Sequence, residues 1–250
     1  MDKIFYTYRI PDEGMLLLKN YEISGNNEDR FLSKEEIIKG ARDASALISL
    51  LSDRIDSEVI SSLPKLKVIA NYAVGYNNID IEEARKRGIR VTNTPGALTD
   101  ATADLTMALL LATSRRIVEG DRLVRERKFE GWKPGLLKGP ALKGKILGII
   151  GMGRIGKTVA SRAHAFGMNI VYHNRKPLLQ SEEEELCVKH VSLEELLKSS
   201  DFISLHVPLM GETYHLLNEK RLSLIKPESI IINTSRGAVI DEKALIKALK

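Results

Sequence analysis

Short apolar runs alternate with amphipathic, charge-rich runs along most of the chain. In the first hundred residues the strand-like runs are KIFYTYRI, ALISLLS, LKVIANYAVGY and IRVTNTPG. Helix-like runs such as SKEEIIKGA separate them, and Ser33 followed by Glu36 has the spacing of a capping box. Strands that alternate with helices are typical of a parallel sheet with helices on its faces. The pattern therefore predicts an α/β fold.

The alternation breaks near Pro95-Gly96 and resumes after Trp132. Between these points the amphipathic run Ala101–Arg127 predicts one long connecting helix. The strand-like runs that follow are KILGII, MNIVYHN, FISLHVPL and SIIINTSRG. We therefore predict two α/β domains in series, residues 1–98 and 99–250. Each is expected to be a doubly wound parallel sheet of Rossmann-like or flavodoxin-like type, with a cleft between the two domains.

A glycine-rich segment, Gly151-Met152-Gly153-Arg154-Ile155-Gly156, stands between the strand-like KILGII and the helix-like KTVASRAHAF. Glycines at such a turn let the backbone approach a pyrophosphate, which the N–H groups and the positive dipole end of the helix then bind. With Lys157 and Thr158 included, the segment also fits the P-loop pattern of NTPases. The motif by itself leaves both kinds of phosphate site open.

The sequence after this helix favours the dinucleotide interpretation. The next strand-like run leads to Asn174, 18 positions after Gly156 (174 − 156), where dinucleotide enzymes bind the adenosine ribose. A P-loop protein needs instead a later strand that ends in a magnesium-binding Asp, and neither FISLHVP nor SIIINTSRG ends in one. The P-loop NTPase remains as the less favoured alternative.

Composition and charge argue against several other classes. The net charge is +5, but basic and acidic residues are interleaved, so no nucleic-acid partner is predicted. No apolar stretch is long enough to span a bilayer and the N-terminus lacks a signal-peptide core, which predicts a cytoplasmic protein without a membrane partner. The lone Cys187 is expected in a strand, and the acidic run Glu182–Glu185 in an exposed loop or helix cap. The histidines lack metal-ligand spacing, so no metal site is predicted.

Several ordered motifs resemble the D-isomer-specific 2-hydroxyacid dehydrogenases, in particular their glyoxylate and hydroxypyruvate reductase branch. They are the Gly151–Gly156 segment, His206-Val207-Pro208-Leu209 and Asn233-Thr234-Ser235-Arg236-Gly237, and NYAVGYNNID extends the resemblance into the first domain. The resemblance implies hydride transfer from a nicotinamide cofactor to the C2 carbonyl of a small 2-oxo acid, giving the D-2-hydroxy acid. It also implies a substrate-binding first domain, a nucleotide-binding second domain and a homodimer formed through the long helix.

The same resemblance implies roles for individual residues. Arg236 is expected to bind the substrate carboxylate and carbonyl oxygen, for which a planar, permanently charged guanidinium is suited. Leu51 and the backbone N–H groups of Val74 and Gly75 are expected to contact the substrate as well. The expected cofactor-binding residues are Gly151, Gly153, Arg154, Ile155, Gly156, Asn174, Arg175, Lys176, Pro208, Thr234 and Ser235.

The residue type at the ribose position bears on the choice of cofactor. NAD-preferring members of the family carry an acidic residue where this chain has Asn174, and Arg175 and Lys176 follow it. An acid would bind the 2′-hydroxyl and repel a 2′-phosphate, whereas a neutral amide with two adjacent cations accommodates the phosphate. We therefore expect NADP(H) as the favoured cofactor and NAD(H) as the alternative.

The resemblance also places a catalytic glutamate and histidine downstream of Arg236, and the sequence stops at Lys250 before both. Two hypotheses remain open on this point. The chain is either a piece of a working reductase, or a shortened, non-catalytic homologue that binds dinucleotide and dimerises.

Overall fold

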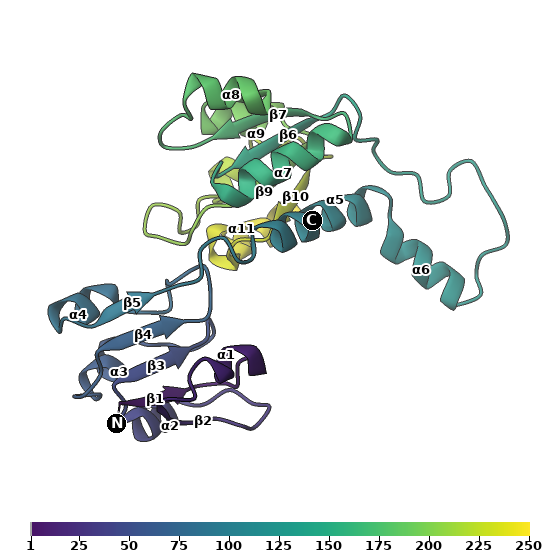
Figure 1. Cartoon of the computed structure of the whole chain (residues 1–250). Coiled ribbons are helices and arrows are strands. Elements are labelled where there is room, and N and C mark those ends of the chain that lie inside the picture. Colours follow the sequence, from purple (N-terminus) through teal and green to yellow (C-terminus); the bar gives the residue numbers. More distant parts are fainter. Residues whose placement is uncertain (1) are drawn as a thin grey trace. The chain divides into compact units, whose positions relative to one another are not determined.

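The computed structural model describes residues 2–250 and divides into two compact units, one up to Ala97 and the other Leu98–Lys250 (Figure 1). Each unit contains a five-stranded sheet whose neighbouring strands are all parallel. The predicted α/β fold with two parallel sheets is therefore confirmed.

In the first unit the strand order is β2-β1-β3-β4-β5, which is the flavodoxin-like order. The strands are β1 (Lys3–Tyr6), β2 (Glu22–Gly25), β3 (Ala46–Ser49), β4 (Val68–Asn71) and β5 (Arg90–Thr92). The helices are α1 (Asp12–Leu16), α2 (Lys34–Ala41), α3 (Ser57–Ser61) and α4 (Ile81–Lys86). Ile37 of α2 and Ile60 of α3 pack with Leu47 and Ile69 of the sheet in one buried cluster. The short α1 contributes no buried side chain.

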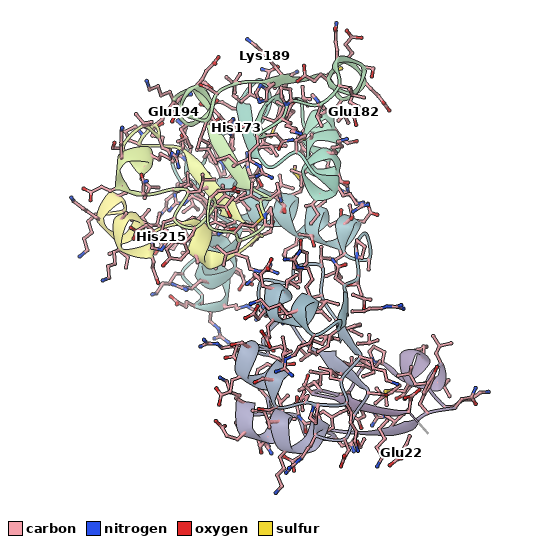
Figure 2. All side chains as sticks on the ribbon, turned by 90° about the vertical axis from the view of Figure 1, so that its left-hand side faces the viewer. Glu22, His173, Glu182, Lys189, Glu194 and His215 are labelled. Atoms are coloured by element: carbon pink, nitrogen blue, oxygen red, sulfur yellow. The ribbon has the colours of Figure 1, made fainter. Side chains whose placement is uncertain are left out.

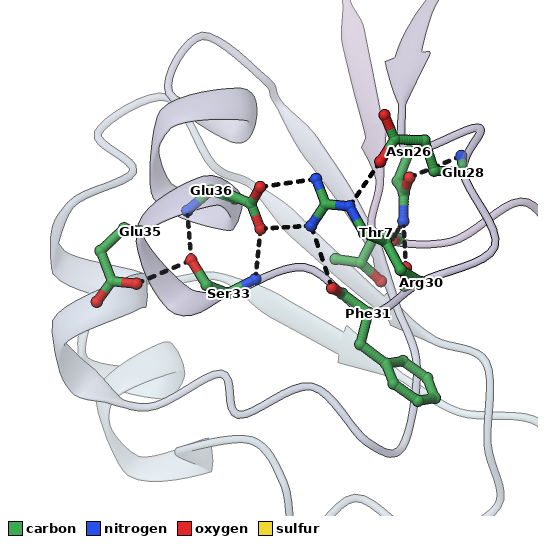
Figure 3. A network of polar contacts seen from close by, with 8 residues as sticks. All are labelled: Thr7, Asn26, Glu28, Arg30, Phe31, Ser33, Glu35 and Glu36. Carbon is green, nitrogen blue, oxygen red and sulfur yellow. Dashed lines mark hydrogen bonds and ion pairs between the residues drawn. The ribbon is translucent and has the colours of Figure 1, made fainter.

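The start of α2 shows why the chain becomes helical after Ser33. The Ser33 hydroxyl accepts a hydrogen bond from the Glu36 N–H, and the Glu36 carboxylate accepts one from the Ser33 N–H, which is the predicted capping box (Figure 3). Arg30 adds two hydrogen bonds of 2.8 and 2.9 Å to the same carboxylate. The Arg30 guanidinium and the Ser33 N–H lower the pKa of Glu36 to about 2. The capping carboxylate is therefore ionised at neutral pH.

In the second unit the strand order is β10-β9-β6-β7-β8, which is the Rossmann order for its first five strands. The strands are β6 (Ile146–Ile150), β7 (Asn169–His173), β8 (Val188–His190), β9 (Phe202–Leu205) and β10 (Ile230–Asn233). The helices are α5 (Thr99–Ser114), α6 (Ile117–Arg125), α7 (Arg154–Ala165), α8 (Gln180–Leu186), α9 (Leu193–Ser199), α10 (Glu219–Leu222) and α11 (Glu242–Ala248), with a 3₁₀ turn at Gly237–Val239. Side chains of α5 and α7 belong to one core cluster, and those of α9, α10 and α11 to another.

The expected single helix over Ala101–Arg127 is wrong, because the structure forms α5 and α6 with a break between them. Arg116, at the break, has a φ of 51° in the left-handed region, which a continuous right-handed helix does not allow. The two helices also differ in burial, because α5 buries Ala103, Met107 and Leu110, whereas α6 buries no side chain. Across residues 2–250, no helix combines the length and the apolar character needed to cross a membrane.

Candidate active site

The glycine turn lies at the carboxyl end of β6, next to β9, where the order of the strands reverses. Such a reversal opens a crevice at the sheet edge, where α/β proteins bind ligands. Gly151 has a φ of 100°, and a Cβ there would lie 2.7 Å from the carbonyl carbon of His206. A Cβ on Gly156 would overlap the carbonyl oxygen of Gly151. Both glycines are therefore required by the close packing of the turn itself.

Gly153 differs from the other two glycines because, apart from its own chain neighbours, no atom of residues 2–250 lies within 4 Å of the position of its Cβ. It is the N-cap of α7, and no side chain caps this helix end. The first N–H groups of a helix have no acceptor within the helix, so those of α7 are oriented for an outside anion. The first turn also carries no acidic residue, and Arg154 is exposed there. This end of α7 fits a pyrophosphate.

The contacts of Lys157 and Thr158 contradict the P-loop interpretation. The Lys157 ammonium forms an ion pair with Glu182 of α8, and the Thr158 hydroxyl donates to the carbonyl oxygen of Arg154 at 2.9 Å. Both side chains are thus engaged in contacts within the unit. No strand of this sheet ends in Asp: β9 ends at Leu205, and β10 ends at Asn233.

Asn174 follows β7 directly and contacts the glycine turn. Its Oδ1 accepts a hydrogen bond of 2.7 Å from the Met152 N–H. Since the carbonyl oxygen is engaged, the amide NH₂ is the group left to a ligand. Arg175 is exposed and forms an ion pair with Glu212 at 3.2 Å, and Lys176 forms no ion pair within the described part of the chain.

The loop that carries these three residues is anchored by Tyr172 and α8. The buried Tyr172 hydroxyl accepts the Leu178 N–H at 2.7 Å and donates to Glu183 at 2.5 Å. Burial and the Glu183 carboxylate together raise the pKa of Tyr172 to about 12. Figure 2 labels His173 at the end of β7 and Glu182 on α8. The loop is therefore fixed at both ends.

The structure corrects two expectations in this region. The expected helix cap at Glu182–Glu185 is confirmed for Glu182, whose carboxylate accepts the Leu179 N–H at the start of α8, but the expected exposed loop is wrong, because all four residues lie within α8 and two of them bind Lys157 and Tyr172. The strand expected at Cys187 is wrong as well, because this residue ends α8 with a φ of 50° and is exposed. The helix itself was not predicted, because a short acidic helix has no apolar periodicity by which the sequence reveals it.

Arg236 lies just beyond the carboxyl end of β10, on the same sheet edge as the glycine turn. Asn233 shapes this segment: its Nδ2 donates to the Arg236 carbonyl at 2.9 Å, and its Oδ1 accepts the N–H and hydroxyl of Ser235 at 3.0 and 2.8 Å. Arg236 is partly buried, and burial lowers the pKa of its guanidinium below the ordinary value. An arginine nevertheless stays cationic at neutral pH.

Thr234 is linked to α5 by a contact that sequence reasoning missed. Its hydroxyl lies 2.9 Å from that of the fully buried Thr106, which also donates to the carbonyl of Thr102 at 2.8 Å. A threonine among the apolar residues of a helix gave no signal of this role. The contact holds α5 against the end of β10.

His206 follows β9 and contacts a buried side chain of that strand. Its Nε2 lies 2.8 Å from the Ser204 hydroxyl, and burial lowers the pKa of the imidazole to about 4. The ring is therefore neutral at physiological pH, with one nitrogen as donor and the other as acceptor. Pro208 is exposed, and its carbonyl accepts a hydrogen bond of 2.6 Å from Thr213.

In the first unit, the carbonyl groups of Val74 and Gly75 are hydrogen-bonded to side chains. Asn93 donates to the Val74 carbonyl and Asn71 to the Gly75 carbonyl, each at 2.8 Å. The N–H groups of the two loop residues make no hydrogen bond within residues 2–250 and so remain available to an anion. Leu51 is 38% exposed in a neighbouring loop, which suits contact with a small ligand.

These features define a class of protein. A Rossmann sheet with an uncapped glycine turn at its reversal point, and an amide after β7 that contacts this turn, has the architecture of an oxidoreductase that binds a nicotinamide dinucleotide. Comparison with known proteins narrows the class. The family described as D-isomer specific 2-hydroxyacid dehydrogenase, NAD binding domain, matches residues 107–250. The chain belongs to this family.

Individual relatives agree with that assignment. A glyoxylate reductase of Thermococcus litoralis is 54% identical over 99% of this chain and 76% of its own length. A glyoxylate reductase of Korarchaeum cryptofilum is 50% identical over 99% and 75%. The crystal structure of the TT0316 protein from Thermus thermophilus superposes with a TM-score of 0.91 at 47% identity, covering 99% of this chain and 78% of that one. The expected family and fold, and a nicotinamide dinucleotide as cofactor, are confirmed, whereas the roles of single residues stay predictions.

Proposed function

We propose that this protein reduces small 2-oxo acids of the glyoxylate type to 2-hydroxy acids with NADPH as the preferred reductant. The observation that carries the proposal is the position of Arg236. It lies on the sheet edge that bears the glycine turn, two strands away across β9, in a segment shaped by Asn233. The proposed dinucleotide site and the cation proposed to bind the substrate therefore lie on the same edge of the sheet. The glyoxylate reductases at 50 to 54% identity support the substrate class.

Arg236 has the chemistry that the reaction requires. A guanidinium pairs with a carboxylate through two parallel N–H···O bonds, and it holds its charge when partly buried. In the proposed complex it binds the 2-oxo acid and polarises the C2 carbonyl, which stabilises the negative charge that develops on that oxygen. A bound reduced nicotinamide supplies the hydride. The N–H groups of Val74 and Gly75 and the side chain of Leu51 remain our candidates for further substrate contacts.

The proposed cofactor contacts follow from the second unit. The N-terminus of α7, with Gly151, Gly153, Arg154, Ile155 and Gly156, takes the pyrophosphate, and Thr234 and Ser235 lie at the ribose of the nicotinamide half. Pro208 is assigned to the adenine side. The preference for NADPH rests on Asn174. Because the Met152 N–H occupies its side-chain oxygen, Asn174 presents only N–H donors to a ligand. Such donors suit a 2′-phosphate, which accepts hydrogen bonds, better than a 2′-hydroxyl that would donate one. Arg175 and Lys176 add positive charge.

We propose that the chain assembles as a homodimer through α5 and α6. Ile117, Val118 and Val124 are between 54 and 65% exposed on a helix that buries none of its side chains. Apolar residues concentrated in this way are typical of an association surface. Val118→Asp with Val124→Asp should shift the mass measured by light scattering from dimer to monomer. A wild-type protein that is monomeric would contradict the proposal.

Turnover distinguishes the proposed reductase from a non-catalytic dinucleotide-binding homologue. We expect NADPH absorbance to fall when glyoxylate is added to the natively expressed protein, and titration fluorescence to show NADPH binding. Tight NADPH binding without turnover of glyoxylate or hydroxypyruvate would favour the non-catalytic homologue. Turnover that is equally fast with NADH would contradict the cofactor preference only.

A further inference from the structure

Glu212 is an exposed carboxylate that contacts the loop carrying Asn174, Arg175 and Lys176, although it belongs to another loop at the same sheet edge. It belongs to the loop after β9, whereas Arg175 belongs to the loop after β7. Its Oε2 lies 3.2 Å from Nη1 of Arg175, within the same compact unit. A carboxylate beside cations that are to bind a phosphate opposes that binding unless it moves away.

We propose that Glu212 is a specificity-determining residue that weakens the binding of dinucleotides carrying a 2′-phosphate. It acts in two ways, by holding Arg175 in an ion pair and by repelling the phosphate charge. The inference rests on the proposed assignment of Arg175 and Lys176 to the 2′-phosphate. The negative charge thus limits a preference for NADPH that Asn174 and the two cations otherwise create.

The charges around Arg175 indicate that Glu212 and a bound 2′-phosphate compete for this arginine. A phosphate monoester carries a charge of about −1.5 to −2 at neutral pH, which two cations would neutralise. Lys176 has no ion pair in the described chain, but Arg175 is shared with Glu212. The two partners are 76 and 66% exposed, and ion pairs so exposed are weak. A bound phosphate can therefore take over Arg175, at a modest loss of affinity.

The surroundings of the pair keep the carboxylate close after Arg175 changes partner. Thr213, next to Glu212, accepts the Met210 N–H at 2.8 Å and donates to the Pro208 carbonyl at 2.6 Å, so the loop backbone is held. On the other side, His190 lies 3.2 Å from the carbonyl oxygen of Asn174 and fixes the start of the ribose loop. Only the exposed ends of Arg175 and Glu212 are free to rearrange.

The test compares Glu212→Gln with the wild-type protein in NADPH and NADH binding, measured by nicotinamide fluorescence at low ionic strength. We expect the NADPH dissociation constant to fall about threefold to tenfold, and that for NADH to change by less than about twofold, because only NADPH carries the extra phosphate. The gain should shrink as salt is raised. Glu228→Gln is the matched control: it makes the same charge change at an exposed site beyond the opposite, amino end of β10, and should alter neither constant.

Two outcomes separate this inference from the function on which it rests. An unchanged or higher NADPH dissociation constant for Glu212→Gln, in a protein that prefers NADPH, contradicts the role of Glu212 alone. A wild-type protein that binds NADH more tightly than NADPH contradicts the proposed cofactor preference. A gain for NADPH that Glu228→Gln reproduces also contradicts the inference, because the effect would then be one of net charge.

Discussion

The two sheets have the same number of parallel strands, but their reversal points are built differently. In the first unit the order reverses between β1 and β3, and the chain after β1 brings Thr7 against Asp53. Both side chains are at least 95% buried, and the Asp53 carboxylate also accepts the Leu50 N–H at 2.7 Å. In the second unit the corresponding place is occupied by the glycine turn, with open space in front of Gly153.

The comparison teaches that the architecture supplies a crevice but the residues decide its use. Side chains that hydrogen-bond across the reversal point fill it in the first unit, and the helix that follows, α1, has five residues and buries none of them. Glycines leave the reversal point open in the second unit, and α7, with 12 residues, brings its dipole to it. Function therefore follows from the site rather than from the fold.

The largest expected effect comes from replacing Arg236, the cation proposed to bind the substrate at the open edge of the second sheet. Arg236→Ala should lower kcat/KM with glyoxylate by about 10²- to 10³-fold, because transition-state charge loses its donor. Arg236→Lys should recover only part of this loss, since an ammonium lacks the planar pair of donors. NADPH affinity, measured by fluorescence, should stay within about twofold of wild type. A full loss of NADPH binding would show that Arg236 acts on the cofactor site instead.

The next test separates the two kinds of glycine. Gly156→Ala should destabilise the protein severely, because its Cβ would overlap the carbonyl of Gly151, whereas Gly153→Ala has room for a methyl group. We expect Gly153→Ala to fold normally but to bind NADPH about tenfold more weakly, since the methyl group occupies the space meant for the pyrophosphate. Thermal unfolding and titration fluorescence measure the two effects. Equal losses of stability in both variants would contradict the assignment.

Acidification should destabilise the open edge through His206. Its folded-state pKa of about 4 lies below the ordinary value of 6.5, so the unfolded chain takes up the proton first as the pH falls. Stability should be unaffected by this group above pH 6.5 and should decrease between 6.5 and 4, by at most about 3 kcal/mol. Denaturant unfolding of His206→Gln should show a smaller decrease. A decrease in His206→Gln as large as in the wild-type protein would contradict this role of His206.

The smallest expected effect concerns the filled edge. Thr7→Val removes the hydroxyl that donates to the buried Asp53 carboxylate, and should destabilise the first unit by about 1 to 3 kcal/mol. The NADPH dissociation constant should not change, because the residue belongs to the unit without the glycine turn. Hydrogen exchange resolved to β1 and β3 measures the first effect. Weaker NADPH binding in this variant would show that the filled edge contributes to the cofactor site.

The sequence predicted what depends on local pattern. The alternation of apolar and amphipathic runs located both parallel sheets, and the spacing of Gly151, Gly153, Gly156 and Asn174 located a turn that Asn174 contacts, because both are fixed by one β-α-β unit. The assignment of this turn to a pyrophosphate and of Asn174 to a ribose stays a prediction. Contacts between residues far apart in the chain have no local sequence pattern, so they could not be predicted. The Thr106–Thr234 contact joins residues 128 positions apart, and the Arg175–Glu212 pair joins residues 37 apart.

The break at Arg116 was missed for a different reason. Amphipathic residues continue across it, so that periodicity alone does not separate α5 from α6. The left-handed conformation at the break is adopted by an arginine. Glycine and proline usually mark such a stop in a sequence, and neither stands at this position.

Cys187 gives the protein a built-in attachment point. It is the single thiol in the chain, it is exposed, and it ends the helix whose Glu183 contacts Tyr172, which in turn holds the loop after β7 through the Leu178 N–H. A maleimide dye coupled there would label one position without any substitution. Its emission would then follow the loop after β7 as cofactor is added, in a protein that is otherwise unaltered.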